Sequence, residues 1–243
     1  MVNILKLAVN DFRNIIRDRF FLFAFFAYPV LFIVFSRIMV HLIAPRIESY
    51  FPLAANYSLL FMFLVILIPF IFSFISAFLI LDERDEHLLT VLRVMPISRN
   101  SYLIYRMLFM SLFAFIVLLI FPPLSGLIDN TQFSYTAYVP VAVLFALFTP
   151  FSALLVSTFA TNKVQAFAIF KIGGSVFILP IFAFLLNLGN LKYIFSPIPN
   201  FWAMLALDSV IKNGTIEIIS LVIGFVFQIV LIGVLFYIFN KKN

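Results

Sequence analysis

Residues 56–80, NYSLLFMFLVILIPFIFSFISAFLI, contain no charged side chain. The run is longer than the roughly 20 apolar residues that a helix needs to cross a bilayer. It does not alternate between apolar and polar residues, as the strand of a membrane barrel would. Pro69 interrupts it, but membrane helices tolerate proline because neighbouring helices can satisfy the freed carbonyl. The stretch therefore predicts a helix that crosses a membrane.

Five further apolar runs of similar length lie on either side of this one. They cover residues 20–43, 101–125, 136–160, 165–187 and 218–239. The chain of 243 residues is 65% hydrophobic and 11% charged, whereas soluble domains are about 45–50% apolar and about 25% charged. Too little polar surface remains for a protein folded in water. We therefore expect one transmembrane domain, residues 1–243, that is all-α and has six spans.

Lysine and arginine are distributed unevenly between the two sides of such a protein. Of the 16 basic residues, four fall on the side away from the termini: Arg37, Arg46, Lys192 and Lys212. Membrane proteins carry an excess of Lys and Arg in their cytoplasmic connections. We therefore expect a multi-pass protein of the cell membrane with both termini cytoplasmic. The same bias accounts for the net charge of +6 without a nucleic-acid partner.

Two segments outside the spans are expected to lie in the membrane surface. Residues 2–19 place apolar side chains on one helical face and Asn, Lys and Arg on the other, which is typical of an interfacial helix. This helix either anchors the chain or also contacts a partner. Residues 189–217 are too short to cross twice and too apolar for a free loop, so we expect a short re-entrant segment in the outer leaflet.

The sequence lacks the residue patterns of several kinds of chemistry. Its seven glycines form no phosphate-binding loop, it has no cysteine, and His41 and His87 lie in different regions. We therefore expect no catalytic residue, no metal site and no cofactor in this chain. No carboxylate lies at mid-depth, where ion-coupled carriers usually have one. Snorkelling to a nearby interface explains Arg37, Arg106 and Lys171.

Residues 82–99, DERDEHLLTVLRVMPISR, form the one long charged stretch of the chain. Within it, Leu88, Leu92 and Met95 have the i, i+4, i+7 spacing of one helical face, and Pro96 ends the segment. The acids before this face would favour the start of a helix through its dipole. A short helix with one apolar face, held outside the bilayer, is suited to a groove on another protein.

This stretch resembles the first cytoplasmic loop of ATP-binding-cassette (ABC) permeases of the type-two exporter superfamily. Residues 83–85 match the acidic opening of that loop, Leu89 and Leu92 match its apolar positions, and residues 96–99 match its close. The chain departs from the pattern at residues 87–88, where Gly-Thr is usual, and at Thr90, where an acid is usual. The likeness extends over the whole chain, and residues 161–173 resemble a subgroup of fluoroquinolone-type export permeases.

The resemblance implies a coupling helix in residues 82–99 that docks on a separate ATPase subunit, which would hold ATP and Mg. Two ATPase subunits would pair with two permeases, identical or paralogous. The expected docking residues are Glu83, Arg84, Asp85, Glu86, Leu88, Leu89, Leu92, Arg93, Met95 and Pro96. Arg13 and Arg17 of the interfacial helix are expected to contact the acids of this loop.

The second and fifth spans usually line the path in such permeases. In the second span the aromatic and apolar candidates for the wall of a path are Phe61, Met62, Phe63, Phe72 and Phe74. Such a wall would favour an amphipathic or hydrophobic cargo, which could be a drug, a peptide or a lipid. Two other classes stay open: a self-sufficient channel or secondary carrier, and a membrane-embedded enzyme that modifies lipids.

Overall fold

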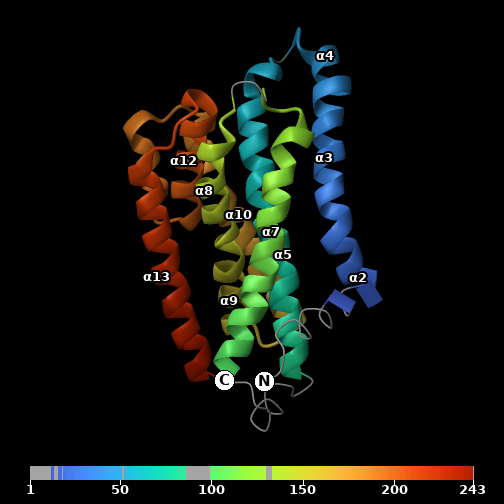
Figure 1. The fold of residues 1–243 in the computed structure, drawn as a ribbon, viewed down its shortest axis with the longest axis vertical. Coiled ribbons are helices and arrows are strands. Elements are labelled where there is room, and N and C mark those ends of the chain that lie inside the picture. Colours follow the sequence, from blue (N-terminus) through green and yellow to red (C-terminus); the bar gives the residue numbers. More distant parts are fainter. Residues whose placement is uncertain are drawn as a thin grey trace.

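The computed structural model describes residues 12–13, 16–17, 19–50, 52–85, 99–129 and 133–242. All regular structure in these residues is helical, and six helices are long and apolar enough to cross a membrane (Figure 1). The prediction of an all-α membrane protein with six spans is therefore confirmed. The spans are Phe23–Ile47, Ala54–Asp85, Asn100–Ser125, Tyr135–Phe159, Lys163–Leu185 and Ile218–Lys242.

Several spans are built from more than one helical element. Helix α2 (Arg19–Leu22) precedes the first span. The first three spans are formed, in chain order, by the π-helical turn η1 (Phe23–Ala27), α3 (Tyr28–Ile38), the π-helical turn η2 (Met39–Ile43), α4 (Ala44–Ile47), η3 (Ala54–Asn56), α5 (Tyr57–Asp85) and α7 (Arg99–Ser125). The last three contain α8 (Tyr135–Ala146), α9 (Phe148–Phe159), α10 (Lys163–Ile178), α11 (Ile181–Leu185) and α13 (Ile218–Lys242).

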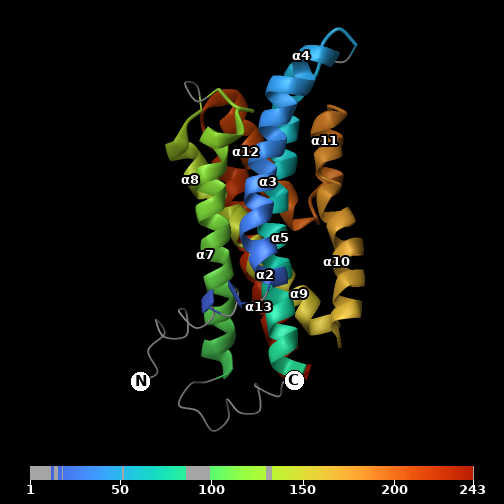
Figure 2. The same ribbon diagram turned by 90° about the vertical axis from the view of Figure 1, so that its right-hand side faces the viewer.

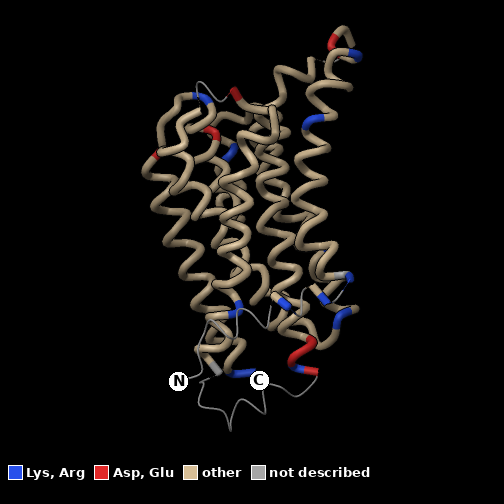
Figure 3. The backbone as a smooth tube through the Cα atoms, turned by 45° about the vertical axis from the view of Figure 1, so that its right-hand side comes forward, with Lys and Arg blue, Asp and Glu red and all other residues tan. Residues whose placement is uncertain are grey.

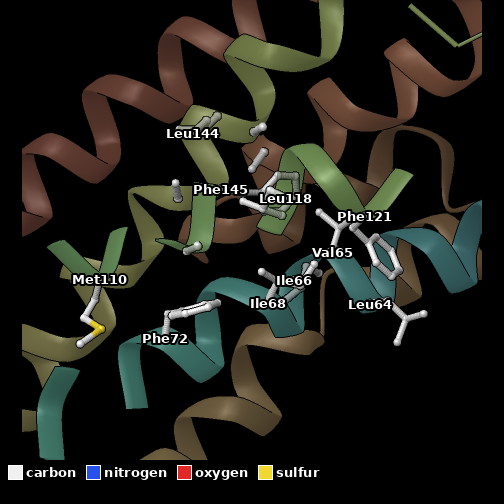
Figure 4. Packing of buried hydrophobic residues seen from close by; sticks show 14 of the residues in the cluster. Leu64, Val65, Ile66, Ile68, Phe72, Met110, Leu118, Phe121, Leu144 and Phe145 are labelled. Atoms are coloured by element: carbon white, nitrogen blue, oxygen red, sulfur yellow. The ribbon is translucent and has the colours of Figure 1, made fainter. Parts of the chain in front are cut away.

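Helix α5 lies at the centre of the bundle. It packs against α7, α9 and α10, and most of its side chains are buried. Small residues such as Ser73, Ser76 and Ala77 allow neighbouring membrane helices to approach closely. Figure 4 shows side chains of α5, α7 and α8 packed together, among them Phe72 and Leu144. Because α5 contacts these helices, a displacement of its end would also displace several of them.

Residues 189–217 contain the 3-10 turn η5 (Gly189–Phe195) and helix α12 (Pro199–Asn213), which ends at Gly214 with a left-handed φ of 65°. Helix α12 packs against α13, α8 and α5 and buries Phe201 and Met204 completely. The indole N–H of Trp202 donates to the carbonyl of Ser196 at 3.1 Å. This segment therefore contains a short helix that is buried in the bundle on one side. Its depth in a membrane stays a prediction.

The two ends of the bundle differ in their charged residues. At the end that we call the charged end, α5 ends at Asp85, α7 begins at Arg99, α10 begins at Lys163 and α13 ends at Lys242. Figure 3 shows basic and acidic residues at this end and others at the opposite end, toward which η5, α12 and the start of α13 lie. Helices α10 and α11 stand at one edge, beside α5 (Figure 2).

Candidate functional site

Three consecutive charged residues at the end of α5 contact three different helices. Asp82 reaches α10, Glu83 reaches α7 and Arg84 reaches the end of α9. Successive residues of an α-helix point about 100° apart, because 3.6 residues make one turn. A charged triplet can therefore bind three neighbours only if its helix is surrounded, as α5 is. We call Asp82, Glu83 and Arg84 the charged triplet.

Glu83 and Arg106 form a buried ion pair between α5 and α7. Their exposed fractions are 9% and 3%. The guanidinium of Arg106 also donates to the hydroxyl of Tyr102 at 3.1 Å and lies 5.7 Å from the centre of that ring. Buried charges are tolerated when they are paired and hydrogen-bonded. The pair therefore fixes α5 to α7 at the two points where the chain enters and leaves residues 86–98.

Arg84 binds the C-terminal end of α9. Its guanidinium donates to the carbonyls of Ser157, at 3.3 Å, and Ala160, at 2.7 Å. The last carbonyls of a helix have no partner within it, and a basic side chain can satisfy them. Lys242 of α13 donates to the neighbouring carbonyl of Thr158 at 3.4 Å, and its ammonium lies 4.4 Å from the centre of the Phe159 ring. The end of α9 is thus held from two helices.

Asp82 forms an ion pair of 2.5 Å with Lys163, the first residue of α10. The turn before α10 is itself well bonded, because the Asn162 side chain accepts from the amide of Gln165 at 2.9 Å. The Gln165 side chain in return accepts from the amide of Thr161 at 2.9 Å. Reciprocal bonds of this kind stabilise the start of a helix. Helix α10 therefore begins on a rigid turn that is tied to α5.

Part of the docking stretch expected from the sequence is described by the structure. Asp85 is exposed, whereas Glu83 and Arg84 turn into the bundle and bind α7 and α9. The other expected docking residues lie outside the described residues, and their role stays a prediction: Glu86, Leu88, Leu89, Leu92, Arg93, Met95 and Pro96. Most of the expected interfacial helix, residues 2–19, lies outside them too.

The arginines lie in different environments, and the expected contact of Arg13 and Arg17 with the loop stays a prediction. Arg13 and Arg17 are exposed, and within the described residues neither forms an ion pair with an acid of α5. Snorkelling is the wrong explanation for Arg106, because its side chain is buried against Glu83 rather than extended to water. Arg37, in the first span, donates to the carbonyl of Leu124 at 2.7 Å near the end of α7. That contact ties the first span to the third toward the opposite end.

The five candidates for a path wall fall into two groups. Phe61, Met62 and Phe72 are at most 1% exposed and pack between helices of this chain. Phe63 and Phe74 are half-buried. Of the five, Phe74 lines a cavity of about 250 Å³ between the first, second and fifth spans, and the other residues of its lining are Ala24, Tyr28, Phe70, Ile71 and Phe167.

The six spans and the buried ionic contacts at one end define a polytopic helical membrane protein whose helices are linked at the charged end. The model of the Rv2686c-like fluoroquinolones export permease family matches residues 11–236, so the chain belongs to this family. The resemblance to exporter permeases is thereby confirmed, and the chain is a membrane subunit of the export permease type.

Two relatives are similar over nearly their whole length. They are the fluoroquinolones export permease proteins MT2760 and Rv2686c of Mycobacterium tuberculosis, from strains CDC 1551 / Oshkosh and ATCC 25618 / H37Rv. Each is 26% identical to this chain, and the match covers 96% of this chain and 92% of the relative. No solved structure matches the chain.

Proposed function

We propose that this chain is the membrane-spanning subunit of an ATP-driven exporter, and that it works with a separate ATPase. Its family is one of export permeases, and its sequence has no loop that could hold a nucleotide phosphate. The energy for transport would then come from another subunit, which would bind ATP and Mg. Because basic residues favour the cytoplasmic side, the charged end faces the cytoplasm, where ATP is available.

The charged triplet is the observation that carries this proposal. It directly precedes residues 86–98, the segment proposed to dock on the ATPase, and α7 begins directly after that segment. A displacement of the segment would act on α5 and α7 together, because Glu83 and Arg106 join them. Asp82 and Arg84 would pass the same movement to α10 and to the end of α9. The triplet thus connects the docking segment mechanically to four spans.

A second permease copy would cover the face formed by the first and fifth spans. Both spans, like the sixth, bury far fewer of their side chains than the second span, which lies between the first and the fifth. Exposed apolar side chains line both, including Val34, Phe167 and Ile172. The cavity beside Phe74 opens on the same face. We therefore place the path between the two copies, along α5 and α10.

The lining of this cavity favours an aromatic amphipathic cargo. Tyr28, Phe70, Phe74 and Phe167 contribute four rings, and aromatic groups gain from edge-to-face and stacked contacts beyond their apolar area. The two relatives are named for fluoroquinolones, which are planar aromatic amphiphiles. A fluorescent fluoroquinolone is therefore the first cargo to test. Replacing Phe74 by Ala should weaken its export, whereas replacing the buried Phe61 should instead impair folding.

The pairing with an ATPase can be tested by affinity purification from the native host. The full-length chain should bring down an ABC ATPase subunit, which mass spectrometry identifies. Replacing both Leu89 and Leu92 by Asp should abolish the association while the chain still reaches the membrane. Thr90→Asp is the matched control, because it adds a charge to the same segment without removing an apolar side chain. Survival of the complex in the double variant, or the absence of any ATPase from the wild-type sample, refutes the proposal.

A further inference from the structure

Helix α7 borders a groove on the outside of the bundle, and α13 forms the opposite wall over part of its length. Both pack against α8 and α9 but make little contact with each other within the described residues (Figure 1). Two adjoining cavities follow α7 and share Leu108 and Leu147: one of about 360 Å³ lies between α7 and α13, and one of about 390 Å³ lies between α7 and α8. Their lining residues, taken together, are Ile104, Met107, Leu108, Ser111, Leu112, Phe115, Val143, Ala146, Leu147, Pro150, Ile229, Ile232, Gly233 and Phe236.

Particular residues of the sequence shape the floor and one wall of the groove. Leu147 lies at the break between α8 and α9, and Pro150, one turn further, lacks the N–H that would continue the hydrogen-bond ladder. In α13, a Cβ on Gly233 would meet no heavy atom of the described residues within 4 Å, so this glycine leaves the groove open. Ser111, the polar residue of the lining, donates its hydroxyl to the carbonyl of Ala146 at 2.8 Å.

The length of the groove matches one leaflet of a bilayer. Along α7 it extends from Ile104 to Phe115, which is about 17 Å at 1.5 Å per residue. Half of the hydrocarbon core of a bilayer is about 15 Å. A partner helix that crossed the whole membrane would instead need an apolar groove along the full span. The dimensions therefore favour a single acyl chain over a helix of another subunit.

Polar residues lie at the mouth of the groove, at the charged end. Asn100 is one turn before Ile104 on α7, and Asn240 is one turn beyond Phe236 on α13. Residues four apart share a helical face, so both amides fall on the side of the groove. Lys241, in the last turn of α13, is exposed. Two amides and an ammonium are suited to hydrogen-bond and neutralise a phosphate.

We propose that this groove binds one glycerophospholipid from the leaflet at the charged end. One acyl chain lies along α7 on the floor formed by Leu147 and Pro150, with α13 beside it near the charged end. The phosphate lies at Asn100, Asn240 and Lys241. The site is separate from the cavity beside Phe74, which lies between the first, second and fifth spans, and it is therefore distinct from the proposed cargo path.

The test compares Gly233→Leu with Val234→Leu. The first introduces a leucine into the groove at a position where an added Cβ meets no neighbour, whereas the second places a leucine at the next residue, which is 50% exposed and does not line the groove. Each full-length protein is purified in mild detergent, and native mass spectrometry measures the phospholipid that stays bound. We expect wild type and Val234→Leu to retain one phospholipid per chain, and Gly233→Leu to retain at least tenfold less.

Two further measurements keep the test decisive. Leu108→Trp narrows the groove from the side of α7 and should also reduce the bound phospholipid. This second variant provides the test if Gly233→Leu does not fold. Added phosphatidylglycerol should bind the delipidated protein several-fold more weakly after Lys241→Gln, whereas phosphatidylcholine should be less affected. Undiminished lipid in both groove variants overturns the proposal. The proposal is also overturned if the groove variants keep their lipid but lose oligomerisation, because the groove would then bind another subunit.

Discussion

The buried pair of Glu83 and Arg106 gives the sharpest prediction about the charged end. We consider Glu83→Gln, Arg106→Gln and the double variant. Removing one partner of a buried ion pair costs about 3–5 kcal/mol, because a charge is left without compensation. The side chains of Arg106 and Glu83 are 4% and 11% exposed, so water can do little to rescue either.

The structure also indicates which single variant is the worse. After Glu83→Gln, the guanidinium of Arg106 keeps its bond to the Tyr102 hydroxyl, so we expect a loss near the lower limit, about 3 kcal/mol. After Arg106→Gln, Glu83 loses its ion-pair partner, and its second carboxylate oxygen has no hydrogen bond within the described residues. We therefore expect a loss near the upper limit, about 5 kcal/mol. The double variant buries no charge and should be less destabilised than Arg106→Gln alone.

The free energy of unfolding can be measured by titrating the detergent-solubilised protein with dodecyl sulfate. Trp202 is the single tryptophan of the chain and lies in α12, away from the mutated end, so its fluorescence reports unfolding without direct perturbation. Lys212→Gln is the matched control, since it breaks an ion pair with Asp208 whose lysine is 60% exposed. Such a pair is worth about 0–1 kcal/mol. If the costs of the two single variants simply add in the double variant, the two charges are not coupled and the reasoning is wrong.

Three other substitutions test contacts elsewhere in the bundle. Arg84→Gln should leave the last carbonyls of α9 without a donor, which hydrogen exchange would detect as faster exchange at the end of α9 with unchanged membrane insertion. Gly224→Leu should lower the free energy of unfolding by about 1–3 kcal/mol, because its Cβ would lie 3.1 Å from the Cβ of Trp202. Equal stability of this variant and the wild type would contradict the close packing at Gly224. Asn162→Ala should cost about 1 kcal/mol through the lost N-cap of α10, measured by the same titration, whereas Asn162→Ser should restore most of it.

Hydropathy predicts the spans well because a membrane helix must be apolar over its whole length. The apolar run at 56–80 lies within the second span, and the run at 101–125 ends at the same residue as the third. The first span extends further than the predicted 20–43, to Ile47. That region holds Pro45 and Arg46, which lower its hydropathy without ending the helix.

Hydropathy could not predict the partner of Arg106, because it scores each residue separately. Its acid, Glu83, lies on another helix, 23 positions earlier in the chain. One signal was available: both residues lie close to residues 86–98 on consecutive spans. Antiparallel neighbours joined by a short connection bring such residues to similar depth, and a basic residue inside a span requires a partner or an interface.

The lining of a path was equally hard to predict, for a different reason. In water, the buried face of a helix is apolar and its exposed face is polar, but lipid and protein core are both apolar. The sequence of α5 therefore gives no contrast that separates Phe61 and Phe72, inside the bundle, from Phe74 at the cavity. Only the packing of α10 and η1 against α5 distinguishes them.

The most direct test of the account uses the purified chain in sealed lipid vesicles, alone and together with the ABC ATPase that we expect to co-purify with it. Alone, the chain should hydrolyse no ATP and move no fluorescent cargo. With the proposed ATPase partner, ATP hydrolysis and cargo movement should appear together, and Arg106→Gln should reduce movement more than hydrolysis. Cargo movement or ATP hydrolysis by the chain alone would contradict the claim that its energy enters from a separate subunit at the charged end.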